Sequence, residues 1–247
     1  SVVSRGTPPV HAVTFDFWNT IVAENAVGTR RGPQIVEALE AFSISVTTDE
    51  VGAAFGAGWD WFVERWKSNA PTTTRDSVEV SLLHLPVPTE DPLVVDAITE
   101  LVAQGSDPAS ITLAPGIGEC LERLAAADVR LGIICDVGMT PSTALRRYLE
   151  FHDLLGFFDH WSFSDEVGCY KPDARIFAHA AAGLGQPDPE RTAHVGDLRR
   201  TDVAGARGVG WTSVRYHGLS DDPRDEGPEA HLVVAHHYDL PAALGVD

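Results

Sequence analysis

From Pro115 to the C-terminus, short apolar runs rich in β-branched residues alternate with helical segments, and this alternation restricts the fold more than any other feature of the sequence. It is typical of a parallel sheet covered by helices, because parallel strands are joined by crossovers that are usually helical. An apolar run at 10–15 predicts one further strand. We therefore expect an α/β core, with strands at 10–15, 130–135, 159–163, 192–196, 211–216 and 232–235.

A different pattern fills residues 23–108, where the apolar residues recur at helical spacing and no comparable strand is found. Breaks rich in glycine and proline separate four expected helices. This stretch has the size of a small domain. We expect an all-helical domain at 23–108, inserted between the two parts of the core, 1–22 and 109–247, with helices at 34–42, 49–67, 76–85 and 93–104.

The charge of the chain argues against some classes of partner. Its 247 residues carry a formal net charge of -18, which disfavours nucleic acid and anionic membranes. A phosphate substrate remains compatible, because a bound metal ion reverses the local field. The three irregularly spaced cysteines, together with a start that lacks an apolar signal segment, predict a reduced, cytoplasmic protein. The oligomeric state does not follow from the sequence.

Acidic and basic side chains follow several of the predicted strands. Asp16 ends the first strand, Asp136 ends the second, and Asp197 follows the strand at 192–196 with Asp202 five residues later. Lys171 precedes a predicted helix. Because ligands bind at the carboxyl ends of parallel strands, we expect these side chains to meet at one edge of the sheet.

Such a group of side chains is suited to phosphoryl transfer. A carboxylate can attack phosphorus and form an aspartyl-phosphate. Attack by one anion on another requires charge neutralisation, which Mg²⁺ bound by a few oxygen ligands can supply. A lysine and a hydroxyl or thiol donor would bind the remaining phosphoryl oxygens.

The order and spacing of these segments resemble the haloacid dehalogenase superfamily. The resemblance covers residues 10–22 and the chain from Leu113 onward, and it implies a Rossmann-like core with a helical cap inserted after the first motif. It rests on Asp16-Phe17-Trp18-Asn19-Thr20, Leu113-Ala114-Pro115-Gly116, Cys135-Asp136, Ser164-Asp165-Glu166-Val167-Gly168, Lys171-Pro172-Asp173 and Gly196-Asp197 with Asp202.

The resemblance implies a magnesium site and a nucleophile. Asp16 would be the nucleophile and a metal ligand, and the backbone carbonyl of Trp18 a second ligand. Asp197 would be the third protein ligand, and Asp202 would support the metal or its water.

The resemblance also implies contacts to the phosphoryl group. Lys171 would neutralise the nucleophile and the phosphoryl group, while the thiol of Cys135 and the backbone N–H of Asp136 would contact phosphoryl oxygens. Asn19 and Thr20, which follow the nucleophile, are expected beside the substrate.

In the expected cap, four aromatic residues recur at helical spacing and favour an internal core of that domain: Phe55, Trp59, Phe62 and Trp66. Trp61 lies off this stripe and is the better candidate for facing a ligand. Arg30, in the loop that enters the cap, is a candidate for binding a substrate anion.

Trp18 departs from the family pattern. Phosphatases of the superfamily usually carry there an aspartate that protonates the leaving group and then activates water. An indole has one N–H donor and no basic site, so it can do neither, and the loss of a general acid/base costs about 10²–10⁴-fold in rate.

The departure leaves several functions open. The intact acids Asp197 and Asp202 favour a Mg²⁺-dependent phosphatase that acts on a small organic phosphate. An aromatic residue in place of the aspartate is typical of dehalogenases, since halide leaves without a proton. Phosphonate cleavage would require a cap lysine, for which Lys67 is the candidate. A non-catalytic binding protein with the same fold is the remaining alternative.

Overall fold

The computed structural model describes residues 9–23, 31–88 and 90–246, which form two compact units. The first unit is built from residues 9–23, 111–136 and 149–246. The second is built from residues 31–88, 90–110 and 137–148.

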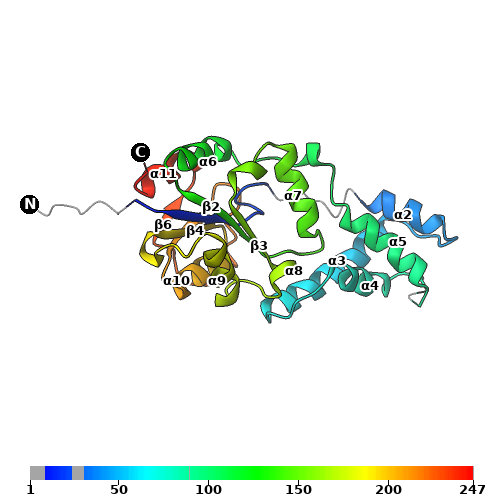
Figure 1. The fold of residues 1–247 in the computed structure, drawn as a ribbon. Helices are drawn as coiled ribbons and strands as arrows, with labels where there is room; N and C mark the ends of the chain where they lie inside the picture. Colours follow the sequence, from blue (N-terminus) through cyan, green and yellow to red (C-terminus); the bar gives the residue numbers. More distant parts are fainter. Residues whose placement is uncertain (1–8, 24–30, 89, 247) are drawn as a thin grey trace, which may run out of the picture. The chain divides into compact units, whose positions relative to one another are not determined.

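The first unit contains a parallel sheet of six strands in the order β3-β2-β1-β4-β5-β6 (Figure 1). Every neighbouring pair is parallel, which confirms the predicted α/β core. The strands are β1 (Ala12–Phe15), β2 (Arg130–Cys135), β3 (His160–Phe163), β4 (Thr192–Gly196), β5 (Thr212–Tyr216) and β6 (Leu232–Val234).

Strand β1 lies at the centre of this sheet, between β2 and β4. Its last residue, Phe15, is in register with Ile133 of β2 and Val195 of β4. All four residues of β1 are buried, as expected for a strand covered on both faces. The residues that follow β1, β2 and β4 therefore lie side by side at the carboxyl edge of the sheet.

Helices cover both faces of the sheet. In Figure 1, α6 (Ile117–Ala126) and α11 (Leu240–Ala243) lie on one face, and α9 (Ala174–Gly183) and α10 (Ala204–Gly208) lie on the other. The short helix α8 (Ser164–Val167) follows β3 directly. A π-helical turn, Arg199–Val203, follows β4 and carries Asp202.

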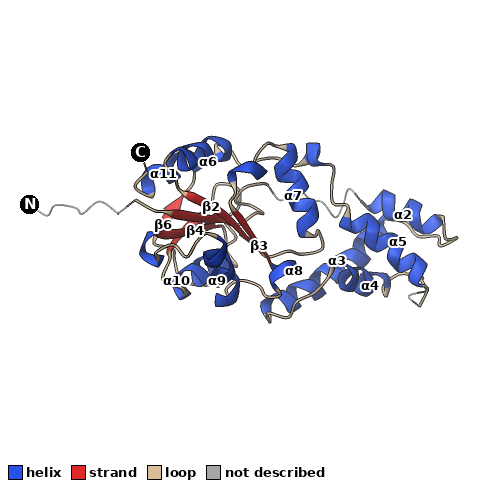
Figure 2. Cartoon of the chain, viewed as in Figure 1, coloured by secondary structure: helices blue, strands red, loops and turns tan. Residues whose placement is uncertain are grey.

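The second unit contains helices joined by loops and no strand among its described residues (Figure 2). Its helices are α2 (Gly32–Glu40), α3 (Thr48–Lys67), α4 (Thr74–Leu82), α5 (Pro92–Ala103) and the first part of α7 (Ser142–Phe151). Thr47 and Glu50 form a capping box at the start of α3, and Thr73 and Asp76 form another at the start of α4. These caps set the helix starts one or two residues before the first residues predicted from periodicity.

Residues 137–148 cluster with the helical unit, whereas the sequence analysis places them in the core. The hydroxyl of Thr74 donates to the carbonyl of Met139 at 3.0 Å. A Cβ on Gly138 would lie 3.1 Å from the Trp59 ring, so the two pack tightly. Contacts of this kind between residues far apart in the sequence leave no periodic signal.

The prediction that the aromatic stripe forms the core of the helical unit is confirmed for Phe62, which is 3% exposed, but not for the stripe as a whole. The buried core of this unit is aliphatic, with residues such as Leu39, Leu82 and Ile98. Of the stripe, Phe55 packs only at the edge of that core, and Trp59 is 42% exposed. Helix α3 therefore carries part of its aromatic stripe outside the aliphatic core of the unit.

All three cysteines are buried and free, as the irregular spacing indicated. Among the described residues, none of the helices is both long enough and apolar enough to cross a membrane.

The core of the first unit contains a fully buried histidine, His237. Its Nε2–H donates to the carbonyl of Thr20 at 2.7 Å, and its ring stacks on Tyr216 at 4.1 Å between centroids. Nδ1 has no hydrogen-bond partner among the described residues. Burial lowers the pKa of His237 from 6.5 to about 4, so the folded protein holds this ring neutral.

The free energy of unfolding is therefore expected to fall as the pH falls from about 6.5 to about 4. In that window the unfolded chain binds a proton at His237 and the folded chain does not, which costs up to about 3 kcal/mol. Urea unfolding at pH 7 and pH 4.5 should show a smaller pH dependence for His237→Gln than for the wild type. Equal pH dependence in the two proteins would contradict a neutral buried ring.

Candidate active site

Asp16 is the first residue after β1 and lies at the carboxyl edge of the sheet. Its backbone N–H donates to the carbonyl of Val195 in β4 at 2.8 Å, which fixes the start of the loop. The residue is 9% exposed, so its carboxylate is nearly enclosed. A side chain at this point projects from the end of a central strand.

Lys171 joins two of the carboxylates. Its Nζ donates at 2.7 Å to Asp16 Oδ1, at 2.7 Å to Asp202 Oδ1 and at 2.9 Å to the carbonyl of Ile134. An ammonium group has three N–H donors, and these bonds use all of them. The ammonium therefore holds the Asp16 carboxylate in this structure, and contact with any further oxygen would require one bond to be exchanged.

Three carboxylates gather around this lysine. One ligand atom from each of Asp16, Asp197 and Asp202 lies within 4.8 Å of the others. Asp202 is the most enclosed, since Oδ1 also accepts from His194 Nε2 at 2.9 Å and Oδ2 accepts from the Leu198 N–H at 3.0 Å. The structure thus brings together the four residues whose sequence positions predicted a charged site.

The cluster shifts the pKa of each member. Burial raises the pKa of Asp16 to about 7, with Lys171 opposing this rise and Asp202 adding to it. Burial, together with the charges of Asp16 and Asp202, raises the pKa of Asp197 well above its usual value. Burial also acts on Asp202, but Lys171 and His194 outweigh it and lower the pKa of that carboxyl.

Lys171 stays charged for a related reason. Burial disfavours its ammonium, but the negative charges of Asp16, Asp202 and Asp136 outweigh burial and raise its pKa well above the usual value. Two of the three clustered acids have raised pKa values, so one ammonium does not balance the negative charge of the cluster.

This excess of buried negative charge fits a divalent cation. Mg²⁺ prefers oxygen ligands, and carboxylates are the usual protein donors for it. Burial raises the pKa values of Asp16 and Asp197. A bound cation would lower both pKa values. The donor set is therefore chemically suited to the predicted metal.

Two further side chains support Asp202, those of His194 and Thr14, and neither was predicted from the sequence. His194, in β4, is fully buried, and its Nδ1 lies 2.8 Å from the hydroxyl of Thr14 in β1. Since a carboxylate only accepts, Nε2 carries the proton and Nδ1 accepts from Thr14. The alternation of residues along β1 and β4 is the signal that places Thr14 and His194 beside each other.

Gly196 provides room for this arrangement. A Cβ at this position would lie 2.1 Å from Cγ of Asp202, closer than any real contact. The glycine that ends β4 therefore allows the carboxylate to pack directly against the backbone.

Cys135 and Asp136 lie at the end of β2, and both side chains have hydrogen-bond partners within the first unit. The Cys135 thiol is fully buried and donates to the Asp136 carbonyl at 3.5 Å. Burial raises the pKa of this thiol well above its usual value, so it is a packed neutral group. The Asp136 carboxylate accepts from the backbone N–H of Lys171 at 2.9 Å and so orients the lysine segment.

Trp18, Asn19 and Thr20 form the tight turn that follows Asp16 and Phe17. Asn19 has φ of +57°, which asparagine tolerates better than most residues, and its N–H donates to the Val22 carbonyl at 2.7 Å. Trp18 packs edge-on against Phe17 with ring centroids 5.1 Å apart. The side chain of Thr20 is fully buried, so a substrate would reach it only after its neighbours move.

The predicted contacts in the helical unit have different outcomes. Arg30 lies outside the described residues. Trp61 lies in α3, where the guanidinium of Arg65 sits 5.8 Å from the centroid of its ring, and it lines an open pocket of about 590 Å³. Its contact with a substrate stays a prediction.

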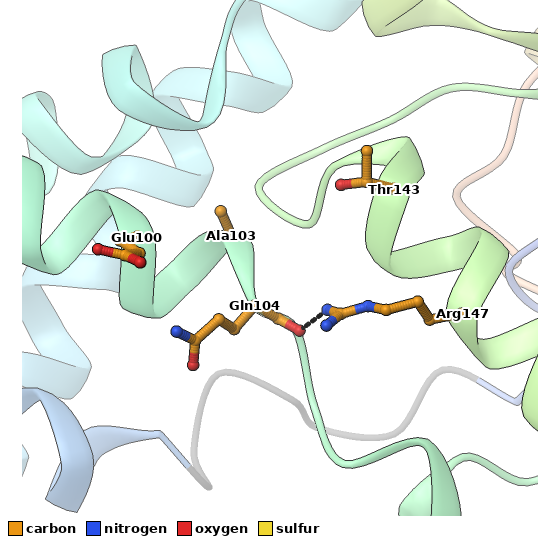
Figure 3. Close-up of a pocket in the computed structure, with 5 residues that line it drawn as sticks. All are labelled: Glu100, Ala103, Gln104, Thr143 and Arg147. Carbon is orange, nitrogen blue, oxygen red and sulfur yellow. Dashed lines mark hydrogen bonds between the residues drawn. The ribbon is translucent and has the colours of Figure 1, made fainter.

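A second pocket of the helical unit has a volume of about 300 Å³ (Figure 3). It lies between α5 and α7, and Arg147 donates there to the carbonyl of Gln104. The bond satisfies a carbonyl at the end of α5, which is a structural role for this arginine. The residues that line the pocket are Glu100, Ala103, Gln104, Thr143 and Arg147.

Comparison with known families adds to this geometry. A family model described as haloacid dehalogenase-like hydrolase matches residues 10–210. Haloacid dehalogenase-like hydrolase domain-containing protein 3 of Bos taurus is 36% identical over 103 residues, which cover 39% of this chain and 41% of that protein. Glyceraldehyde 3-phosphate phosphatase of Pyrococcus abyssi is 35% identical over 102 residues, covering 41% of each protein. These matches thus span about two fifths of the relatives' length.

Solved structures resemble nearly the whole chain. A HAD phosphatase from Thermococcus onnurineus has a TM-score of 0.71 at 24% identity, with 96% of this chain and 98% of that chain covered. The HAD-hydrolase YfnB of Bacillus subtilis, bound to magnesium, has a TM-score of 0.69 at 16% identity, covering 96% and 100%. A 2-haloacid dehalogenase from Pseudomonas syringae has a TM-score of 0.68 at 20% identity, covering 96% and 98%. At these identities the likeness is one of fold.

Proposed function

Because the chain belongs to the haloacid dehalogenase-like hydrolases, we propose that it is a Mg²⁺-dependent phosphatase that acts on a small organic phosphate through an aspartyl-phosphate on Asp16. The observation that carries this proposal is the buried cluster of Asp16, Asp197 and Asp202 around Lys171. Retention of three acids at one edge is difficult to explain without a cation, because uncompensated buried charge is costly. The phosphatase named among the relatives is consistent with this chemistry.

In the first step, an oxygen of Asp16 attacks phosphorus, and the bond from phosphorus to the ester oxygen of the substrate breaks. Lys171 orients the attacking carboxylate through its 2.7 Å bond to Oδ1. Since Asp202 and the Ile134 carbonyl hold the same ammonium, the lysine stays in position while Asp16 changes partner. The positive charge of Lys171 also offsets the repulsion between the two anions.

In the second step, water attacks phosphorus and the Asp16 carboxylate leaves, which regenerates the free enzyme and releases inorganic phosphate. Asp16, Asp197 and the carbonyl of Trp18 would hold Mg²⁺, and Asp202 would support it through the lysine and the turn that carries Asp197. When bound, this ion supplies charge neutralisation at the phosphoryl oxygens.

Trp18 sets a condition on the substrate. Since an indole neither donates a proton to an ester oxygen efficiently nor removes one from water, the leaving group must depart largely as an anion. Phosphates with acidic leaving groups, such as aryl or acyl phosphates, meet this condition better than simple alkyl phosphates. The proposed substrate class is therefore a small organic phosphate with an activated leaving group.

The test is hydrolysis of p-nitrophenyl phosphate by the full chain, in Mg²⁺ and after metal removal with EDTA. We expect turnover to fall by about 10²-fold or more on metal removal, since a metal supplies several kcal/mol to phosphoryl transfer, and to return when Mg²⁺ is added back. Turnover that is unchanged in EDTA would contradict the metal-dependent route.

Trp18 also favours a second candidate, hydrolysis of a carbon–halogen bond by the same Asp16. Halide leaves without a proton, and the attack on carbon needs no cation. Halide release from a 2-haloacid, measured in EDTA, separates the two functions. The phosphonate alternative has less support, because the side chain of Lys67 is 55% exposed and lies 3.7 Å from Glu64, not in a desolvated pocket.

A further inference from the structure

The turn that carries Asp197 and Asp202 leaves the sheet immediately after β4 and is anchored from two directions. On the side of the charged cluster, the Leu198 N–H donates to the Asp202 carboxylate at 3.0 Å. On the other side, the first two N–H groups of the π-helical turn, those of Arg199 and Arg200, both donate to the carboxylate of Asp225, at 2.5 and 3.2 Å.

Asp225 belongs to a polar loop, residues 217–231, that connects β5 with β6 and that we name the acidic strap. No side chain of the turn itself caps these N–H groups, since its N-cap residue is Leu198. The first N–H groups of a helical turn have no partner within the turn, so a carboxylate there is stabilising. A residue distant in sequence thus serves as the cap.

The acidic strap is fastened to the sheet by Arg215, the β5 residue in register with Gly196. Arg215 is 7% exposed, and its guanidinium pairs with Glu229 through Nε at 2.9 Å and Nη2 at 3.1 Å. Its Nη1 donates to Asp221 at 2.9 Å. The pair is bidentate, with Arg215 buried and the side chain of Glu229 47% exposed, so it fixes the orientation of the strap at its base.

Two further contacts bring the strap onto Arg199. Glu229 also accepts from Arg199 Nη2 at 3.2 Å. A Cβ on Gly227, which has φ of +150°, would lie 3.0 Å from the carbonyl carbon of Arg199, so the two backbones touch. The strap therefore reaches the turn at Asp225, Gly227 and Glu229, while Arg215 holds its base.

From this geometry we propose that Asp225 is a positioning residue for the metal site, because it fixes the turn between Asp197 and Asp202. Arg199 is two residues after Asp197, so loss of its cap frees the backbone on which that ligand is held. Asp225 touches neither substrate nor metal in this scheme and acts through the turn. The inference rests on the proposed function, since it concerns affinity for Mg²⁺.

The test is calorimetric titration of the full chain with Mg²⁺, comparing Asp225→Ala and Asp225→Asn with the wild type. We expect about fivefold weaker binding in Asp225→Ala, equivalent to about 1 kcal/mol, the usual effect of removing a helix cap. Asp225→Asn should lose less, because its amide oxygen still accepts one of the two N–H bonds.

Asp222→Asn is the matched control, since Asp222 lies in the same strap but its carboxylate bonds Arg224. Its Mg²⁺ affinity should equal that of the wild type. Hydrogen exchange of the peptide 197–203, measured without metal, should be faster in Asp225→Ala and unchanged in the control.

The outcomes separate the inference from the function on which it rests. Wild-type affinity in Asp225→Ala, with or without a lower melting temperature, would overturn the positioning role and leave a purely structural cap. A wild-type chain that binds no Mg²⁺ would overturn the proposed function, and the inference with it.

Discussion

Replacement of Asp16 by asparagine is expected to reduce kcat for p-nitrophenyl phosphate on the order of 10⁴-fold or more. A carboxamide has nearly the same shape as the carboxylate but is a very poor nucleophile toward phosphorus, so the covalent route is lost. Rapid quench with ³²P-labelled acyl or aryl phosphate should trap labelled protein from the wild type and none from Asp16→Asn.

The fold should survive this change. Lys171 keeps its bonds to Asp202 and the Ile134 carbonyl, and the pKa of about 7 at Asp16 indicates that its buried charge is unfavourable. Thermal unfolding of Asp16→Asn should therefore occur at or above the wild-type temperature in metal-free buffer. A variant that is folded and retains turnover within about tenfold of the wild type would place the nucleophile elsewhere.

Replacement of Trp18 by aspartate is expected to raise turnover of a simple alkyl phosphate by about 10²-fold, at the lower end of what a general acid/base contributes. The gain should be small for p-nitrophenyl phosphate, whose leaving group departs without a proton. Steady-state kcat for the two substrates, measured over a range of pH, would show the difference and a new ionisation in the alkyl phosphate profile.

Trp18→Asn is the control for this gain. Both substitutions remove the edge-on contact between Trp18 and Phe17, and such aromatic pairs contribute about 0.5–1.5 kcal/mol beyond their buried area. Any loss of packing is thus common to both variants, and only the aspartate can transfer a proton. Equal rates in the two variants would show that another group already supplies the proton, or that the natural reaction requires none.

The sequence predicted the core and the charged cluster because both follow from local patterns and one topological rule. Strands β2 and β4 begin and end at the residues expected, since each is a short apolar run with clear ends. Asp16 and the two acids after β4 meet because β1 lies beside β4, which places their carboxyl ends at one edge. Lys171 reaches them from the segment between α8 and α9. The substrate contacts assigned to Asn19, Thr20, Trp61 and Arg30 stay predictions.

Features that depend on contacts between distant polar residues could not be predicted from the sequence. The acidic strap has no hydrophobic periodicity, so nothing in its sequence shows that Asp225 caps the turn after β4. The same holds for residues 137–148, which follow a core strand but cluster with the helical unit. The aromatic stripe predicted the buried Phe62 but not the exposed Trp59, because a regular helical spacing describes a face without telling what covers it.

The central place of β1 has a consequence for how this chain is made. Residue 12 pairs with residue 130 of β2 and with residue 192 of β4, so the strand that leads to Asp16 leaves the ribosome long before either partner. The helices between β1 and β2 can fold before β1 has a partner strand, because their contacts are local. The charged cluster can therefore form only late in synthesis, and in a nascent chain stalled before β4 the strand that precedes Asp16 would be paired on one edge only, with β2.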